Sequence, residues 1–309
     1  MMEQATKRRN ALVEWVRLIA KDPAGLLGLI IVTLFVVWAL IQGSLEIAAV
    51  ETHDPRLAFV LLPHNPMVIS QSTSLLPPSF KYIMGTNADG QDIWSRILYS
   101  IPYSAAYPAF VVVLSAILIG AVLGIAAGYF GGGWWDEILM RITDAFLSVP
   151  AIVLAIVVAV LLHASFIGMI YAFIIIWWPI YARLFRAETL KVKSMDYIAA
   201  AQLYRVSPPL KLFTKYLFMN AVDPIIAYAM LDFGNVILTA SVLNFIGGVG
   251  IQPGTPILGT MASDGVSYGF PPRYWWWAIY PSLAVLVIAL GFVLLGDRLQ
   301  DIIGGRAAY

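Results

Sequence analysis

The sequence contains no cysteine and few charged residues. With 0 cysteines among 309 residues, the chain forms no disulfide, has no thiolate metal site and carries no cysteine nucleophile. Lys, Arg, Asp and Glu together make up 12% of the residues, which is about half the share found in an ordinary soluble domain. So little charge cannot cover a water-facing surface of this size, and a purely soluble protein is therefore excluded.

The charge balance and the scarcity of histidine exclude further classes. The 19 basic and 18 acidic residues leave a net charge of +1, which gives no electrostatic basis for binding nucleic acid. The 3 histidines (His53, His64 and His163) lie too far apart in the sequence to indicate a metal site. No Gly-Lys pair occurs, so the GxxxxGK[ST] phosphate loop is absent and we expect no cofactor site in this chain.

Hydrophobic residues make up 60% of the chain and gather in long runs. A helix that crosses a membrane needs about 20 apolar residues. Runs of suitable length cover residues 24–43, 104–128, 142–163, 166–183, 219–246 and 275–296. Because backbone polar groups must be satisfied within the hydrocarbon, these runs are helices. The sequence predicts an all-α integral membrane protein with six transmembrane helices.

The basic residues predict the orientation of these spans. With the N-terminus in the cytoplasm, all 19 basic residues except Arg56, Lys81, Arg96 and Arg273 lie on the cytoplasmic side. Both termini are then cytoplasmic. The predicted divisions are a cytoplasmic segment 1–23, a first span 24–43, an extracytoplasmic segment 44–103, a five-helix core 104–298 with a cytoplasmic loop 184–218, and a cytoplasmic tail 299–309.

The most informative part of the cytoplasmic loop reads SMDYIAAAQLYRVSPPLKLF (194–213). Asp196 can cap a helix that begins at Tyr197, and Ser207 can cap a second helix with Pro208 at its first position. The alanine run 199–201 favours helix. Two short helices with a corner at 205–207 are suited to docking on a cytoplasmic partner. The alternative is a well-capped loop without a partner.

Several blocks of the chain together resemble one known family. In order, they are MGTNADGQDIWSRILYS (84–100), AGYFGGGWWDEILMRITDAFLSVP (127–150), WWPIYARLFRAETLKVKSMDYIAAA (177–201), IQPGTPILGTMASDG (251–265) and GFVLLGDRLQDII (291–303). They are similar to the LGTDxxGRDxxSR, GYFGGxxDxxxMRxxD, WPxYARxxRAExLxxK, VQPPTPxWGxMxxDG and GFNxLGDxLRD patterns of membrane permease subunits of ATP-binding-cassette importers. The resemblance is strongest to the second permease of the dipeptide/oligopeptide group.

This resemblance implies the type I importer permease fold in a prokaryotic plasma membrane. It implies a subunit that is not itself an enzyme and that forms half of the pore of an ATP-driven, binding-protein-dependent importer of dipeptides or oligopeptides. The implied partners are a second homologous permease, two ATPase subunits that bind ATP and Mg, an extracytoplasmic substrate-binding protein and membrane lipid. An oligosaccharide importer of the same group is the first alternative, and nickel is the least favoured substrate. A secondary transporter or channel without an ATPase, or an integral membrane enzyme, is the alternative from another class.

The resemblance also assigns the cytoplasmic loop as the one that inserts into a cleft of the ATPase. Its residues here are Asp196, Tyr197, Ala199, Ala200, Ala201, Gln202, Tyr204, Arg205, Val206 and Ser207. Ala199 stands where the family has Glu, and Arg205 stands where it has Gly, which permits a turn that Arg adopts less readily. Either the corner is built differently, the ATPase cleft is altered to match, or the companion permease carries more of the coupling.

Polar residues within the predicted spans have two interpretations each. Asp232 and Asn235 lie in the fifth span, where an ionisable group is costly and faces protein or water. They line the translocation path, or they hydrogen-bond to a neighbouring helix or to the companion permease. Glu137, Arg141 and Asp144 share one helix face. They form a polar latch at the cytoplasmic mouth, or a structural ion network.

Overall fold

The computed structural model describes residues 15–162, 165–196, 198, 213, 217–247, 255–268 and 273–304. This part of the chain is mostly helical and contains no β-strand beyond an isolated bridge between Thr86 and Asp92. Its helices are α2 (Pro23–Glu51), α3 (Ile93–Val113), η3 (Leu114–Ala121), α4 (Val122–Tyr129), α5 (Trp134–Leu147), α6 (Ala151–Leu161), α7 (Phe166–Lys193), α10 (Met219–Gly247), α11 (Leu258–Ser267) and α12 (Trp275–Ile303), with short turns η1 (Leu57–Phe59) and η2 (Gln71–Thr73).

Five helical stretches of the described chain are long and apolar enough to cross a membrane. They are Pro23–Glu51, Ile93–Tyr129, Ile167–Lys193, Met219–Ile246 and Trp275–Ile303, and α5 with α6 supplies a sixth if this bent pair forms one span. This agrees with the six predicted spans, although the boundaries differ. Helix α2 continues past the predicted end at 43 to Glu51. Helix α3 begins at Ile93, well before the predicted start at 104, because the Asp92 carboxylate caps it.

The predicted third span, 142–163, is broken in the middle. Helix α5 ends at Leu147, helix α6 begins at Ala151, and the two axes meet at 88°. Pro150 precedes the first residue of α6, and a proline both lacks an N–H donor and disfavours helical backbone at the residue before it. Pro179, in contrast, lies inside α7, which continues through it to Lys193.

Glycines bring the second span close to α7. Positions 120, 124 and 128 form a small-residue stripe along η3 and α4. A Cβ at Gly120 would lie 2.4 Å from the Cβ of Tyr181, and one at Gly124 would lie 2.4 Å from the carbonyl oxygen of Ala182. Small residues at such spacing allow the close backbone approach that membrane helices use in place of a hydrophobic driving force. These glycines therefore fix α7 against η3 and α4.

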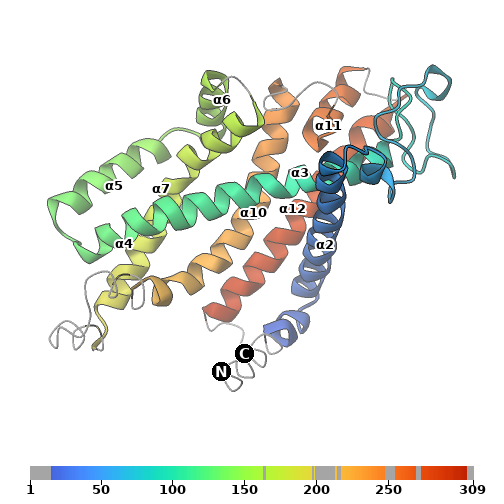
Figure 1. Cartoon of the computed structure of the whole chain (residues 1–309). Coiled ribbons are helices and arrows are strands. Elements are labelled where there is room, and N and C mark those ends of the chain that lie inside the picture. The colour runs from blue at the N-terminus through green and yellow to red at the C-terminus, as the bar shows by residue number, and fades with distance from the viewer. Residues whose placement is uncertain are drawn as a thin grey trace.

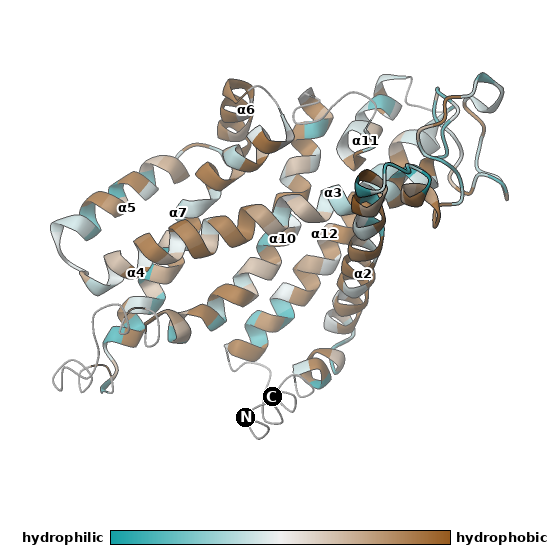
Figure 2. Cartoon of the chain, viewed as in Figure 1, coloured by the Kyte–Doolittle hydropathy of each residue, from teal (hydrophilic) through white to brown (hydrophobic). Residues whose placement is uncertain are grey.

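Helix α10 lies between two buried clusters (Figure 1). On one side Val236 and Ala240 join the cluster formed with η3, α4 and α7. On the other side Ile237 joins the cluster formed with α2, α3 and α12, where the Phe233 and Phe292 rings stack with centroids 5.3 Å apart. Figure 2 shows apolar residues over the outward faces of α2 and α6, as expected of surfaces in contact with lipid.

The start of α2 and the end of α12 lie at the same end of the bundle. The Arg298 Nη2 atom donates to the carbonyl oxygen of Leu18, 3.3 Å away. The C-terminal end of α7 and the N-terminal end of α10 point toward that end too, whereas residues 52–92 and α11 lie at the opposite end (Figure 1). The bundle thus has one end that carries the predicted cytoplasmic parts and one that carries the predicted extracytoplasmic parts.

Candidate coupling segment and translocation region

Most predicted coupling residues lie outside the described part of the chain. Asp196 is described and exposed. Tyr197, Ala199, Ala200, Ala201, Gln202, Tyr204, Arg205, Val206 and Ser207 fall outside the described residues. The structure therefore shows the frame on either side of this segment, and the two predicted short helices stay a prediction.

That frame is anchored by contacts on both sides of the segment. Before it, the Lys193 Nζ atom donates to the carbonyl oxygen of Tyr129 at 2.7 Å, which fixes the end of α7 to the end of α4. After it, the Phe218 ring stacks on Phe185 of α7, with centroids 5.8 Å apart and planes 14° apart. Ile198 and Leu217 are 0% and 1% exposed. The two ends of the segment are therefore tied to α4 and α7.

The predicted polar network is rearranged in the structure. Glu137 and Arg141 pair along α5 with 3.8 Å between the charged atoms, and both side chains are largely exposed. Asp144 does not join them but forms an ion pair with Arg183 of α7. Glu137, Arg141 and Asp144 all line the same hollow beside α5. Helical spacing alone could not reveal that Asp144 pairs with Arg183 on another helix.

The strongest polar tie between α5 and α7 was not among the predicted residues. Asp136, which is 3% exposed, accepts hydrogen bonds from Arg186 Nε at 2.5 Å and from Arg186 Nη2 at 2.7 Å. An arginine that donates two hydrogen bonds to one carboxylate forms a strong contact with a fixed geometry. These pairs border a hollow of about 440 Å³ that is also lined by Trp134 and Met140. The ion pairs join the start of α5 to the last part of α7, and a latch function stays a prediction.

Asp232 of α10 is buried, with 2% of its surface exposed. Trp177 Nε1 donates to Oδ1 at 2.9 Å, and the Tyr181 hydroxyl donates to Oδ2 at 2.8 Å. Both donors come from α7, so the carboxylate forms a helix-to-helix hydrogen bond. Asn235 lies three residues on and is exposed, and its side chain also hydrogen-bonds to the Asp232 carboxylate, so the structure brings the two predicted path residues together. Trp177 and Tyr181 are four residues apart and therefore share one face of a helix. Nothing in the sequence indicated that Asp232 is the partner of both.

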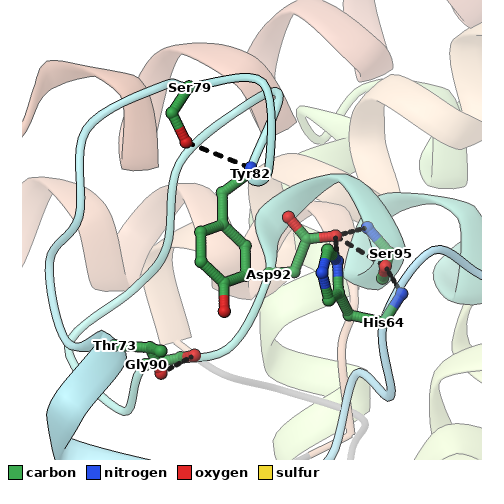
Figure 3. Close-up of polar contacts among 7 residues, drawn as sticks. All are labelled: His64, Thr73, Ser79, Tyr82, Gly90, Asp92 and Ser95. Carbon is green, nitrogen blue, oxygen red and sulfur yellow. Dashed lines mark hydrogen bonds and ion pairs between the residues drawn. The ribbon is translucent and has the colours of Figure 1, made fainter.

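The outer segment contains a compact polar cluster at the start of α3 (Figure 3). Asp92 Oδ2 accepts hydrogen bonds from the backbone N–H of Ser95 at 3.0 Å and from its hydroxyl at 2.6 Å, and it lies 3.3 Å from His64 Nδ1. The ring of His64 lies against Tyr82. Because Ser95 donates to the carboxylate and not to His64, the three residues cap a helix and do not form a nucleophile-and-base arrangement. Among the described residues no group of three or more His, Asp or Glu could hold a metal ion.

The long apolar helices are those of a multi-pass membrane protein, and the family comparison identifies it as a transport subunit. Residues 116–309 match the family model described as binding-protein-dependent transport system inner membrane component. The chain belongs to this family, and it is a multi-pass protein of the plasma membrane with the type I importer permease fold.

Curated relatives extend the match over most of the chain. The sequence is 36% identical over 247 residues to the probable D,D-dipeptide transport system permease protein DdpC of Escherichia coli, covering 80% of this chain and 81% of the relative. It is 34% identical over 251 residues to the dipeptide transport system permease protein DppC of Haemophilus influenzae, covering 79% and 83%. It is 32% identical over 281 residues to the DppC protein of Alkalihalophilus pseudofirmus, covering 91% and 85%.

Proposed function

We propose that the chain forms half of the pore of an ATP-driven importer of dipeptides or short oligopeptides. The single observation that carries the substrate class is the similarity, over about four fifths of the chain, to permeases named for dipeptide transport. The relatives reported above are named for dipeptide transport, which favours a peptide over an oligosaccharide.

A second homologous permease completes the pore in this proposal, and two ATPase subunits drive it with ATP and Mg. The present chain supplies no phosphate-binding loop, so hydrolysis belongs to separate subunits. An extracytoplasmic binding protein delivers the substrate to the end that carries residues 52–92 and α11. The lines of support are the family's binding-protein-dependent character and the predicted coupling loop. The loop was predicted over 184–218, but helix α7 continues to Lys193, so only the residues after Lys193 lie between α7 and α10.

The proposed mechanism is alternating access. Closure of the ATPases displaces the segment between α7 and α10, and the helices attached to it move as bodies between two packed arrangements. The elbow between α5 and α6 supplies a discontinuous helix beside α7, which is the kind of element that transporters place around a substrate path. The pore then opens to one side of the membrane at a time.

The proposed orientation places both termini and the coupling segment in the cytoplasm. Because the chain has 0 cysteines, a single cysteine reports sidedness without interference. Ser72→Cys in the outer segment and Ser194→Cys at the end of α7 form a matched pair, since both serines are exposed. An impermeant maleimide should label the first in intact cells and the second in inverted vesicles. The reverse pattern would overturn the orientation.

Reconstitution tests the function itself. The purified complex, with its ATPases and binding protein, is placed in vesicles and supplied with a radiolabelled dipeptide. We expect ATP-dependent accumulation of the dipeptide and no accumulation with ATPases that cannot hydrolyse ATP. Accumulation of an oligosaccharide without the dipeptide, or accumulation of the dipeptide without any ATPase, would contradict the proposal.

A further inference from the structure

The hydrogen-bonded carboxylate of Asp232 lies on the seam between the two helices that flank the coupling segment. Helix α7 ends at Lys193 and α10 begins at Met219. Three contacts follow one another along this seam. First, the Trp177 and Tyr181 side chains donate hydrogen bonds to Asp232. Next, the Tyr181 ring meets the Tyr228 ring edge-on, and last, the Phe185 ring stacks on the Phe218 ring. The seam runs from the middle of the bundle to the end of the segment.

Aromatic rings form the α7 side of this seam. Phe173, Trp177, Tyr181 and Phe185 recur every four residues and therefore share one face of α7. Phe173 meets Trp177 edge-on with centroids 5.2 Å apart. Tyr181 is 0% exposed, and its other side closes against Gly120 of η3. The Tyr181 side chain is therefore enclosed between η3 and α10.

The two flanking helices share one buried cluster, but each makes its closest backbone contacts with other helices. Helix α7 is fastened to η3, α4 and α5 through the glycine stripe and the Asp136–Arg186 pair. Helix α10 packs closely on α12, since a Cβ at Gly296 would lie 2.6 Å from the backbone nitrogen of Leu231. A displacement of the coupling segment would then move α7 and leave α10 packed on α12, unless a directional contact joins α7 to α10.

We propose that Asp232 is a positioning residue for coupling: its hydrogen bonds to Trp177 and Tyr181 make α7 and α10 move as one body when the coupling segment is displaced. This inference rests on the proposed function. A carboxylate held by two donors from one helix is a directional contact that resists sliding and rotation, and it adds to the ring contacts along the rest of the seam. Loss of the carboxylate therefore uncouples ATP hydrolysis from import without removing either.

The first test compares ATP hydrolysis with import in the reconstituted complex. Asp232→Ala removes the acceptor, Tyr181→Phe removes one donor, and Asp223→Asn is the matched control because Asp223 is an exposed acid on the same helix. For Asp232→Ala we expect import to fall at least fivefold while substrate-stimulated ATP hydrolysis stays within twofold of the unsubstituted complex. Tyr181→Phe should lie between the two, and Asp223→Asn should match the unsubstituted complex.

The second test measures the motion directly. Leu190→Cys on α7 and Met219→Cys on α10 accept spin labels, since both side chains are exposed and the chain has no other cysteine. In the unsubstituted complex the distance between the labels should stay the same with and without ATP. With Asp232→Ala it should change or broaden on ATP binding.

Two results would overturn the inference. One is an unchanged ratio of ATP hydrolysed to substrate imported in Asp232→Ala, whether both rates persist or both fall together. The other is an equally sharp, nucleotide-independent label distance in that variant. If Asp232→Ala does not assemble, Tyr181→Phe carries the same two readouts. Absence of substrate-stimulated hydrolysis in the unsubstituted complex would refute the proposed function instead, so the two failures are distinguishable.

Discussion

Replacing Gly124 with alanine tests the close packing of α4 against α7. The new Cβ would lie 2.4 Å from the carbonyl oxygen of Ala182 and 2.7 Å from the Cβ of Phe185. Neither atom is the end of a flexible side chain, so the two helices must separate. Overpacking of this kind costs about 1–3 kcal/mol, and the higher helix propensity of alanine offsets up to about 1 kcal/mol of it. We expect a net loss of about 1–2 kcal/mol in the free energy of unfolding.

Gly43 of α2 provides the matched control. A Cβ there would lie 3.5 Å from the Cβ of Pro102, which is an ordinary contact. Gly43→Ala should leave the free energy of unfolding unchanged or raise it by up to about 1 kcal/mol. Both variants are measured by denaturant unfolding in detergent, followed by tryptophan fluorescence. Equal stability of Gly124→Ala and the unsubstituted protein, or an equal loss in Gly43→Ala, would refute the packing argument.

Three further predictions use other contacts of the same helices. Arg186→Ala leaves the buried Asp136 without its cationic partner and should lower the free energy of unfolding by about 2 kcal/mol. Arg141→Ala, in the exposed pair with Glu137, should cost less than about 1 kcal/mol, and equal losses in denaturant unfolding would contradict this. Phe185→Ala, at a position 1% exposed, should cost about 3–5 kcal/mol and speed proteolysis within 194–216, and unchanged cleavage would count against the anchoring of that segment. Asp232→Ala should cost about 1–3 kcal/mol because it strands two buried donors, while Asp223→Ala, at an exposed position of the same helix, should stay within about 0.5 kcal/mol. Thermal unfolding in which Asp223→Ala loses as much would be the opposing result.

The spans could be predicted from the sequence because hydrophobic length alone determines them. The residue composition of 24–43 required a membrane helix whatever its neighbours. Helix ends were less predictable, since they depend on capping. The start of α3 follows from one carboxylate, Asp92, which accepts a hydrogen bond from Ser95. Asp92 lies within the segment 44–103, which was predicted as extracytoplasmic and not as part of a span.

Contacts between helices could not be predicted from the sequence, because they join residues that lie far apart in the chain. Asp232 was recognised as unusual, but Trp177 lies 55 residues away in the chain and Tyr181 lies 51 away. The pairing of Asp144 with Arg183 and of Asp136 with Arg186 likewise depends on how α5 folds back on α7. Helical periodicity gives the face on which a residue lies, and only tertiary packing gives the partner that this face meets.

If a separate ATPase moves this subunit through the segment between α7 and α10, that ATPase must lie against the end of α7. Cross-linking detects this contact: Ser194→Cys, in a chain with 0 native cysteines, is treated with a short thiol-to-amine reagent in the assembled complex. We expect a product that joins this chain to the ATPase and whose yield changes when ATP binds. An active Ser194→Cys complex that yields no such product with the ATPase, in any nucleotide state, would show that the ATPase does not act through this segment.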